Sequence, residues 1–347
     1  MEKYSALGIM SGTSLDGLDL ALCHFWEDNQ WHYSIVKAGT VKYPAQLTSK
    51  LRKAQHLSGL DLIALHKEYG RFIAQQVNAF LDGMEKPLLI ASHGHTVFHY
   101  PDGGINLQIG DGAVIAALTG LPVVSDFRST DIALGGQGAP LVPTGDYFLF
   151  PGYAMLLNLG GFSNITIRNP LTAFDICPVN FALNYFARQF AMEYDRDGHL
   201  GRQGQVNPQL LAELDNLPYY SQMPPKSLSD HWFYDNFLAV VEKYKIRPID
   251  KLATIYHHIA RQITNVTNQH QGNILITGGG ARNKFLIELI RQHSANPVVI
   301  PDDETVDFKE AVVFAFLGLL RWLGRTNVFR AVTGASRDTI SGAVYLP

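Results

Sequence analysis

The chain has 347 residues, of which 46% are hydrophobic and 17% charged, so it is too long for one ordinary core and predicts two domains. Its net charge is −3, and its 28 basic residues form no block or stripe, which argues against nucleic acid and anionic membranes as partners. The two cysteines, Cys23 and Cys177, are too few for a disulfide framework or a CxxC metal site. No signal-peptide pattern opens the sequence, and we expect a cytoplasmic protein.

The first distinctive segment is Gly8–Asp19, GIMSGTSLDGLD, which lies between two strand-like runs at 4–10 and 18–25. Its turn combines glycines, hydroxyl side chains and the carboxylate of Asp16, a composition that directs N–H groups and hydroxyls at an anion. It contains no lysine and opens no helix, so it does not fit the GxxxxGK[ST] phosphate loop. A Gly-rich hairpin is more often only a hairpin, and both interpretations stay open on this segment alone.

Alternating strand and helix signals further along the chain favour an α/β architecture. Apolar residues at helical spacing predict a helix over 60–82, and short apolar runs predict strands at 105–109 and 122–125. Residues 131–146, DIALGGQGAPLVPTGD, are rich in glycine and proline and predict an irregular domain crossing or site loop. The apolar run 311–320 is too short to span a bilayer and indicates a buried helix.

Two more glycine turns follow strand-like runs. Gly160-Gly161 joins two such runs, and Gly278-Gly279-Gly280 joins a run to the start of a helix, where N–H groups favour an anion. ATPases of the actin, hexokinase and Hsp70 type use two hairpin clips around the phosphates and a third glycine turn beside the adenosine. The order of the three turns in this chain is similar to that scheme.

Nearly the whole chain, from about Gly8 to Gly342, resembles the anhydro-N-acetylmuramic acid kinase family. The segments that carry the resemblance are GIMSGTSLDGLD, SHGHTVFHYP, LQIGDG, VVSDFRSTDIALGGQGAPLVP, LNLGGFSNIT, PPKS, ITGGGARN, the segment at Glu310 and VTGA. The resemblance implies an actin-like (ribonuclease H-like) two-domain α/β fold with an interdomain active-site cleft. We expect the domains at 1–127 with 311–347 and at 128–310.

The resemblance also implies a cytoplasmic ATP-dependent kinase of bacterial cell-wall recycling that uses Mg²⁺. Such enzymes cleave the 1,6-anhydro bond of anhydro-N-acetylmuramic acid with water while phosphorylating O6, and release N-acetylmuramic acid 6-phosphate and ADP. A homodimer is expected by the same resemblance. Two alternatives stay open: a nucleotide-binding relative that has lost catalysis and acts as a sensor, and a kinase for a different sugar.

Nucleotide contacts are implied along all three turns. The implied residues are Gly12, Thr13, Ser14, Leu15, Asp16, Gly17, Leu18, Asp19, Gly160, Gly161, Asn164, Gly278, Gly279, Gly280 and Asn283. Asp16 is the candidate Mg²⁺ ligand, directly or through water, because Mg²⁺ prefers oxygen ligands and keeps much of its water shell. Asp19 lies on the following strand, where pairing or capping is the alternative to a role at the metal.

The acceptor side is implied at Asp175 and at His95, Thr96, Arg128 and Glu310. Asp175 is the candidate base that activates the water attacking C1, a role that suits a carboxylate. By itself an aspartate in this setting favours a turn or cap. Arg128 fits a bidentate contact with a sugar carboxylate and an ion pair with Asp126 or Asp131 equally well. Glu310 by itself complements the dipole of a helix that it opens.

The sequence departs from the family around these acceptor residues. Where the usual pattern is close to FDTGPGN, this chain has FDICPVN, so Cys177 and Val179 replace two glycines. Glycine at these positions permits a positive φ or a close approach of the backbone to the sugar, so we expect a reshaped pocket. The family tends to continue PPKS with TGRE, but residues 228–231 are LSDH, and His95 stands where glutamine is common.

Overall fold

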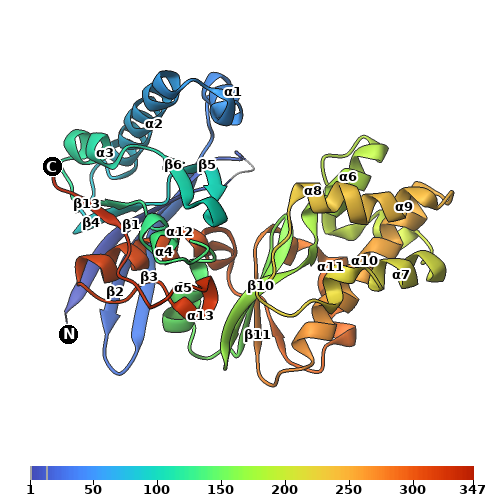
Figure 1. Cartoon of the computed structure of the whole chain (residues 1–347). Coiled ribbons are helices and arrows are strands. Elements are labelled where there is room, and N and C mark those ends of the chain that lie inside the picture. The colour runs from blue at the N-terminus through green and yellow to red at the C-terminus, as the bar shows by residue number, and fades with distance from the viewer. Residues whose placement is uncertain (1, 13–14) are drawn as a thin grey trace. The chain divides into compact units, whose positions relative to one another are not determined.

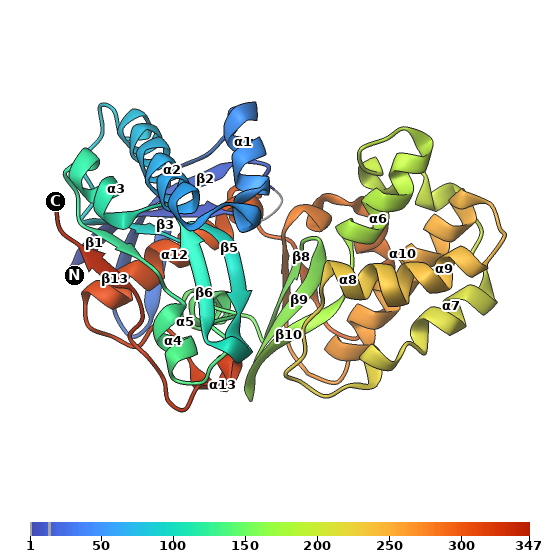
Figure 2. The same cartoon turned by 45° about the horizontal axis from the view of Figure 1, so that its top comes forward.

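A computed structural model describes residues 2–12 and 15–347. They form two compact units, one of residues 1–150 with 308–347 and one of residues 151–307 (Figures 1 and 2). Each unit is built around a mixed sheet of its own, which confirms the predicted α/β architecture.

The first unit extends further along the chain than the sequence predicts. The prediction places residues 128–150 in the second domain, whereas they belong to the first unit. C-terminal residues hold this segment: Thr333 Oγ1 donates to Asp131 Oδ1 at 2.7 Å, and Ser336 N donates to Leu134 O at 3.0 Å. The first of these bonds joins residues 202 positions apart in the chain, a distance over which local sequence patterns carry no information.

The segment 131–146, which is predicted to be irregular, is helical at both of its ends. α4 is Ser129–Ala133 and α5 is Val142–Leu149, so the irregular stretch is confined to residues 134–141. Proline lies in the first turn of α5, where it is tolerated because the first N–H groups of a helix have no internal partner. The prediction of one continuous loop is therefore wrong, since the proline opens a helix.

The sheet of the first unit has six strands in the order β13-β7-β4-β1-β2-β3. β1, β2 and β3 are antiparallel neighbours, whereas β4 and β7 run parallel to β1, and β13 is antiparallel to β7. A separate antiparallel pair is formed by β5 and β6. The strands are β1 (Lys3–Ser11), β2 (Leu18–Glu27), β3 (Trp31–Val41), β4 (Leu89–Ser92), β5 (His95–Tyr100), β6 (Ile105–Ile109), β7 (Val123–Ser125) and β13 (Ala343–Tyr345).

Helices cover both faces of this sheet (Figures 1 and 2). α2 (Gly59–Phe80) and α3 (Gly112–Thr119) pack on the face that carries Leu7 and Ile9, and α12 (Asp303–Trp322) packs on the face that carries Gly8. A Cβ on Gly8 would lie 1.8 Å from Ala311 O, so only glycine lets the backbone of α12 come this close. This approach fixes the position of Glu310, the residue before Ala311.

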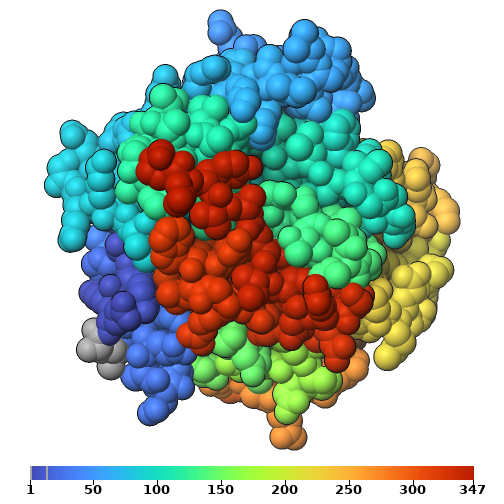
Figure 3. All heavy atoms as spheres, turned by 60° about the vertical axis from the view of Figure 1, so that its left-hand side comes forward, coloured from blue at the N-terminus to red at the C-terminus, as the bar shows by residue number. Residues whose placement is uncertain are grey.

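The remaining helices of the first unit are short. They are α1 (Ala45–Arg52), α13 (Arg330–Thr333), and the 3₁₀ turns η1 (Ala54–His56) and η2 (Pro101–Gly103). Figure 3 looks onto the face of this unit where the C-terminal residues, in red, lie between the blue N-terminal strands and green residues of the same unit. Among the described residues, no helix is both long and apolar enough to cross a membrane.

The second unit has a five-stranded sheet in the order β10-β9-β8-β11-β12. β8, β9 and β10 are antiparallel neighbours, and β11 and β12 run parallel to β8. The order β10-β9-β8-β11-β12 therefore repeats the order β3-β2-β1-β4-β7 of the first unit, as expected for two domains built on one plan. The strands are β8 (Met155–Leu159), β9 (Phe162–Arg168), β10 (Leu171–Pro178), β11 (Ile274–Thr277) and β12 (Val298–Val299).

Helices of the second unit bury one face of its sheet, and their apolar side chains form one core with Leu157, Leu159 and Ile165 (Figure 1). The α-helices are α6 (Asn180–Ala187), α7 (Pro208–Asp215), α8 (Asp230–Trp232), α9 (Ala239–Lys243), α10 (Pro248–Thr267) and α11 (Lys284–His293). The shorter elements are η3 (Arg188–Phe190), η4 (Arg196–Gly198), η5 (Gly201–Gln203), η6 (Pro218–Ser221), the π-helix η7 (Phe233–Leu238) and η8 (Gly279–Arg282).

Candidate functional site

The β1–β2 turn of the first unit contains a strained residue. Leu15 has φ 60°, a left-handed conformation that leucine rarely adopts, and its N–H donates to Gly12 O at 3.3 Å. Gly17 has no room for a side chain, because a Cβ would lie 2.4 Å from Thr40 Cγ2. Strain of this kind clusters at ligand-binding sites, which favours a functional turn over a plain hairpin.

The other predicted residues of this turn differ in their surroundings. Asp16 is exposed, whereas Asp19 lies on β2 and its Oδ1 accepts a hydrogen bond from Thr40 Oγ1 at 2.5 Å. The side chain of Leu18 is fully buried in the core, so it is the main chain of Leu18 that is left to contact a ligand. Thr13 and Ser14, also predicted to bind the nucleotide, lie outside the described residues.

The donor chemistry of this turn fits a Mg²⁺ ion. Mg²⁺ takes oxygen ligands and keeps several waters, so a single exposed carboxylate such as that of Asp16 is a suitable protein ligand. The Asp19 carboxylate is a weaker candidate, because the bond from Thr40 uses one of its oxygens for strand-to-strand pairing.

The β8–β9 turn of the second unit turns its carbonyl groups toward α6. Gly160 O accepts a hydrogen bond from Asn180 N at 3.1 Å, and Gly161 O accepts one from Val179 N at 2.9 Å. The C=O of Gly160 and the N–H of Gly161 belong to one trans peptide and point in opposite directions. The N–H of Gly161 therefore points away from α6, as expected of a group that donates a hydrogen bond to an anion.

The turn after β11 packs directly against β8. Gly278 has φ 81°, and a Cβ on it would lie 2.3 Å from Asn158 Oδ1, so glycine is required on both grounds. A Cβ on Gly280 would lie 2.7 Å from Leu159 Cβ, whereas Gly279 has more space. The second and third glycine turns are thus neighbours in the second unit, with the Asn158 side chain between them.

A row of polar side chains crosses four strands of the second sheet. The register pairs Asp175 of β10 with Asn164 of β9, Asn164 with Asn158 of β8, and Asn158 with Thr277 of β11. Their sequence neighbours Leu157, Ile165 and Phe174 lie in the core, so this row faces away from the core, because alternate strand residues point to opposite faces. Thr277 Oγ1 is buried and has no hydrogen-bond partner among the described residues.

Asn158 is a functional candidate that sequence reasoning missed. It precedes Gly160-Gly161 in LNLGG, yet the glycines alone drew the prediction. Its position between two glycine turns and beside Asn164 follows from strand register, which the sequence does not display. The one signal in the sequence was that Asn158 is polar and stands near the end of an otherwise apolar strand, between two leucines.

Asn283 has a clear structural role. Its Oδ1 accepts a hydrogen bond from Leu286 N at 3.2 Å and caps α11, while its Nδ2 donates to Tyr256 OH at 2.7 Å. Both polar atoms of the side chain are therefore engaged within the second unit. Its contact with a nucleotide stays a prediction.

Asp175 lies at a bulge of β10 and is half-buried. Its N–H donates to Lys226 O at 3.2 Å, and its Oδ2 accepts a hydrogen bond from Leu228 N at 2.9 Å. Burial raises the pKa of the carboxyl above its usual range, and the Leu228 N–H opposes this by stabilising the charged form. The Asp175 carboxylate is thus fixed by a backbone hydrogen bond and has a raised pKa, two properties that a turn or cap residue does not need.

The side chains of Cys177 and Val179 do not face the polar row. Both side chains are fully buried in the core of the second unit, and Val179 has a negative φ of −120°, outside the left-handed region that favours glycine. Burial raises the pKa of the Cys177 thiol to about 12, so it stays neutral. These two side chains therefore point into the core, and the reshaping expected from the loss of two glycines stays a prediction about the main chain.

The departure after PPKS leaves the contact with Asp175 intact. Leu228 reaches the carboxylate through its backbone N–H, which any residue but proline supplies. Ser229 then caps α8, since its Oγ accepts a hydrogen bond from Trp232 N at 3.2 Å. The contact with Asp175 therefore does not depend on which side chain stands at position 228.

In the first unit, Arg128 is held by His93. Nη2 and Nε of Arg128 lie 2.7 Å and 3.3 Å from His93 Nε2, and Nη1 donates to Gly138 O at 2.6 Å. With Arg128 donating to Nε2, the His93 Nδ1–H donates to Gly94 O at 2.8 Å. Burial, then the Arg128 charge, lowers the pKa of His93, which is consistent with a neutral ring.

These contacts argue against the simple ion-pair interpretation of Arg128. Asp126 Oδ1 accepts a hydrogen bond from Ser129 Oγ at 2.6 Å, and Asp131 is bonded by the C-terminal Thr333. Burial lowers the pKa of Arg128 to about 10, so it is a cation at neutral pH. Sequence reasoning missed His93, whose signal is its position directly after the parallel strand β4.

Glu310 lies in the same charged neighbourhood as Arg128. Burial raises the pKa of Glu310, while the positive charges of Lys309 and Arg128 oppose the shift. Lys309 itself is buried and forms an ion pair with Asp146 at 3.0 Å. The charges of Glu310 and Arg128 thus influence each other's pKa within the first unit, and contacts of the two residues with a sugar stay predictions.

His95 and Thr96 are placed differently from Arg128. Gly94 has φ 75° and separates β4 from β5, so His93 and His95 do not follow the alternation of one strand. The buried His95 ring packs edge-on against Tyr69, with centroids 6.5 Å apart. Thr96 Oγ1 accepts a hydrogen bond from Gln108 Nε2 at 3.2 Å. Direct sugar contacts by His95 and Thr96 stay predictions.

A polar cavity of about 200 Å³ opens in the first unit where β4 and β7 end. Its lining includes Ser92, His93, Asn106, Gln108 and Asp126. Ser92 Oγ is buried and has no hydrogen-bond partner among the described residues, so a ligand hydroxyl or carbonyl would satisfy it. The carboxyl ends of parallel strands are where open α/β sheets bind ligands.

Comparison with known proteins gives full-length matches. The family model for anhydro-N-acetylmuramic acid kinase matches residues 4–347. An anhydro-N-acetylmuramic acid kinase of Shewanella loihica is 36% identical over 372 aligned positions, which cover 99% of each chain. One of Aliivibrio fischeri is 35% identical over 371 positions, again with 99% of each chain covered.

A solved structure of low sequence identity is also similar. Component A of the (R)-2-hydroxyglutaryl-CoA dehydratase of Acidaminococcus fermentans matches with a TM-score of 0.47 and 12% sequence identity. The match covers 91% of this chain and 97% of that one.

Proposed function

The chain belongs to the anhydro-N-acetylmuramic acid kinase family and is a sugar kinase, and on this premise we propose that Asp175 is its catalytic base. Asp175 takes a proton from water as the water oxygen bonds to C1 of 1,6-anhydro-N-acetylmuramic acid. The bond between C1 and the anhydro oxygen breaks, and O6 takes the γ-phosphoryl group of ATP. The products are N-acetylmuramic acid 6-phosphate and ADP, and the water proton is left on Asp175.

The environment of Asp175 is the observation that carries this proposal. A general base works best when its pKa approaches the operating pH, and burial raises the pKa of Asp175 in that direction. The single backbone bond from Leu228 N orients the carboxylate through Oδ2, which directs the base function to the other oxygen. Asp175 also ends the row of neutral polar groups formed with Asn164 and Asn158, which suits the binding of water and hydroxyls.

Sugar binding is proposed for Arg128 and Glu310, the charged group of the first unit. The guanidinium of Arg128 has five N–H donors, and its contacts with His93 and Gly138 use three of them, which leaves donors for the carboxylate of the muramic acid. Glu310 accepts from sugar hydroxyls beside it. His93 is added as the residue that orients Arg128, and His95 and Thr96 are retained as further sugar contacts.

ATP binding is proposed for the three glycine turns. The N–H of Gly161 and the glycines at 278–280 offer backbone donors, and the strained β1–β2 turn, which carries Asp16, is the third proposed phosphate contact. Asp16 would hold Mg²⁺, whose charge neutralises phosphate oxygens when the ion is bound. A homodimer in the bacterial cytoplasm, serving peptidoglycan recycling, completes the proposal, and light scattering after size exclusion tests the dimer.

A turnover assay tests the proposed function. Purified protein is incubated with Mg-ATP and 1,6-anhydro-N-acetylmuramic acid, and ADP and sugar phosphate are measured together by mass spectrometry. We expect one sugar 6-phosphate for each ADP, with a mass that has gained water as well as the phosphoryl group. N-acetylmuramic acid is the matched control, because it offers O6 without the anhydro bridge, and we expect little product from it.

Two outcomes contradict the proposal. ADP formation with a plain hexose but not with the anhydro-sugar identifies a kinase for a different sugar. Bound ATP without any turnover at high enzyme concentration identifies a nucleotide-binding relative. The core positions of Cys177 and Val179 give neither alternative support, because these departures do not face the polar row.

A further inference from the structure

Asp175 lies on a bulge that a side chain from a distant segment stabilises. The register of β10 against β9 shifts between Asp175 and Cys177, so Ile176 has no residue opposite it. Tyr219 of η6 donates its hydroxyl to Asp175 O at 2.7 Å. Bulges next to active sites re-aim side chains, and this hydrogen bond fastens the bulge at the residue proposed as base.

The segment 219–228 holds Asp175 at three atoms. Besides the Tyr219 bond to Asp175 O, Lys226 O accepts from Asp175 N at 3.2 Å, and Leu228 N donates to Asp175 Oδ2 at 2.9 Å. The last two bonds come from the backbone, so Tyr219 is the one side chain in this set. Its hydroxyl can therefore be removed by substitution without touching the other two bonds.

The ring of Tyr219 is fixed by its surroundings. It is 4% exposed and packs against Trp232, with ring centroids 5.2 Å apart, and Lys226 Nζ lies 4.7 Å from its centroid. Because the ring is fixed by packing, a phenylalanine would keep the same position. Burial raises the pKa of Tyr219 far above its usual range, so the hydroxyl stays protonated as a donor.

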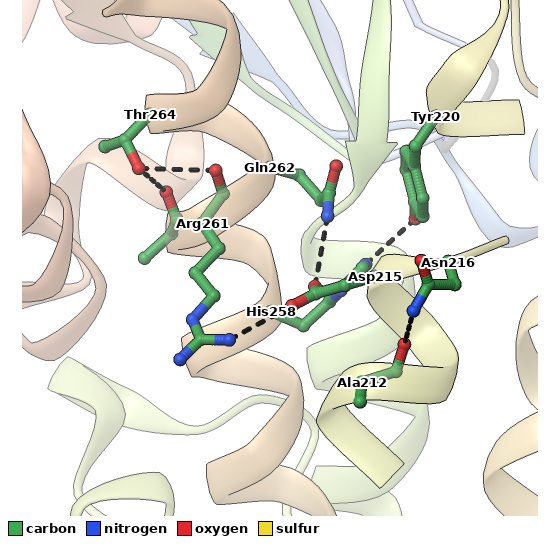
Figure 4. A network of polar contacts seen from close by, with 9 residues as sticks. Ala212, Asp215, Asn216, Tyr220, His258, Arg261, Gln262 and Thr264 are labelled. Atoms are coloured by element: carbon green, nitrogen blue, oxygen red, sulfur yellow. Dashed lines mark hydrogen bonds and ion pairs between the residues drawn. The ribbon is translucent and has the colours of Figure 1, made fainter. Parts of the chain in front are cut away.

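A second network anchors η6 itself to α10 (Figure 4). Tyr220 OH lies 2.9 Å from His258 Nε2, and His258 Nδ1 lies 2.6 Å from Asp215 Oδ1. Gln262 Nε2 and Arg261 Nη1 also donate to Asp215, at 3.0 Å and 3.2 Å. This network holds the end of α7 and η6 in place, and none of its hydrogen bonds includes an atom of Asp175. Tyr220 is thus a matched control for Tyr219.

We propose that Tyr219 is a positioning residue of this kinase, whose hydroxyl fixes the bulge at Asp175 and thereby aims the carboxylate at the attacking water. The inference rests on the proposed role of Asp175 as base. Tyr219 does not itself donate to the substrate, because its hydroxyl proton is committed to Asp175 O. Its effect on the reaction is therefore on the chemical step and not on binding of either substrate.

The test compares Tyr219→Phe with Tyr220→Phe, each of which removes one buried hydroxyl and keeps the ring. For Tyr219→Phe we expect kcat to fall about 10- to 100-fold, as for a small misplacement of a catalytic group, with KM for ATP and for the sugar within about threefold of wild type. For Tyr220→Phe we expect a lower melting temperature and kcat within about threefold of wild type, because its partner is His258. A Tyr219→Phe enzyme with wild-type kcat overturns the proposal, as does an equal loss of kcat in both variants.

A rescue variant separates positioning from folding. Replacing Tyr219 by 4-aminophenylalanine keeps a donor at the same ring position, and we expect its kcat to return to within about fivefold of wild type because a neutral N–H can replace the O–H. If this variant is folded but as slow as Tyr219→Phe, or if Tyr219→Phe does not fold at all, the positioning role is wrong.

Asp175→Asn measured in parallel separates the role of Tyr219 from the role of Asp175. If Asp175→Asn is inactive and Tyr219→Phe has wild-type kcat, the inference about Tyr219 fails alone. If Asp175→Asn keeps wild-type kcat, the base assignment fails and the inference falls with it.

Discussion

In the first unit, whose strand order is β3-β2-β1-β4-β7, His93 follows β4 and the cation Arg128 follows β7. In the second unit, the matching order β10-β9-β8-β11-β12 carries a row of mostly neutral polar groups. Arg128 and Glu310 influence each other's pKa in the first unit. In the second unit, the pKa of Asp175 is set by burial and one backbone N–H. A shared topology thus fixes where the glycine turns lie, while the residues at the strand ends decide the chemistry.

This difference has a physical reason in the proposed reaction. A cation close to Asp175 would favour its charged form and lower its pKa, which weakens a base. In the proposal, a cation on the first unit instead binds the carboxylate of the substrate. Separating the two groups between the units keeps the base strong and the substrate anchored.

The largest expected loss of stability comes from a substitution where the backbones of β1 and α12 are closest. Gly8→Ala places a Cβ 1.8 Å from Ala311 O, where backbone must move, and we expect the free energy of unfolding to fall by about 3 kcal/mol. Gly59→Ala, at a glycine with nothing within 4 Å, should change it by less than about 1 kcal/mol. Urea unfolding of both variants measures the difference, and equal stabilities would show that α12 does not pack as described.

Sequence patterns predict the elements that local periodicity defines. The strand predicted at 105–109 coincides with β6, and the helix predicted over 60–82 differs from α2 by one or two residues at each end. They fail where partners are distant: residues 128–150 join the first unit through C-terminal residues such as Thr333. The same limit explains Asn158 and His93, which acquire their roles from strand register and from the left-handed Gly94.

The next effect tests the charged group of the first unit. Arg128→Lys removes the planar fork that contacts His93 and Gly138, and we expect kcat/KM for the sugar to fall about 10- to 100-fold, mostly through KM. KM for ATP should stay within about threefold, since the glycine turns are unchanged. Arg325→Lys, at an exposed ion pair with Glu27, is the matched control and should keep the wild-type kcat/KM for the sugar and KM for ATP. A loss confined to ATP would assign Arg128 to the nucleotide.

The smallest effect on activity is expected in the core of the second unit. Val179→Ala should lower the free energy of unfolding by about 1–2 kcal/mol, because a fully buried side chain loses methyl groups, while kcat and both KM values stay within about threefold of wild type. Steady-state kinetics together with thermal unfolding check this. A tenfold change in KM for the sugar, without a change in stability, would mean that Val179 lies against the substrate.

In the proposed reaction, Asp175 acts as the base while ATP binds elsewhere. The most direct measurement is kcat of Asp175→Asn at saturating Mg-ATP and anhydro-sugar, paired with its Kd for ATP by calorimetry. Loss of the base should lower kcat about 100- to 10,000-fold and leave the Kd for ATP within about threefold. Asp235→Asn, at an exposed aspartate of the same unit, should keep both values. Wild-type kcat in Asp175→Asn would contradict the role of Asp175 as the base.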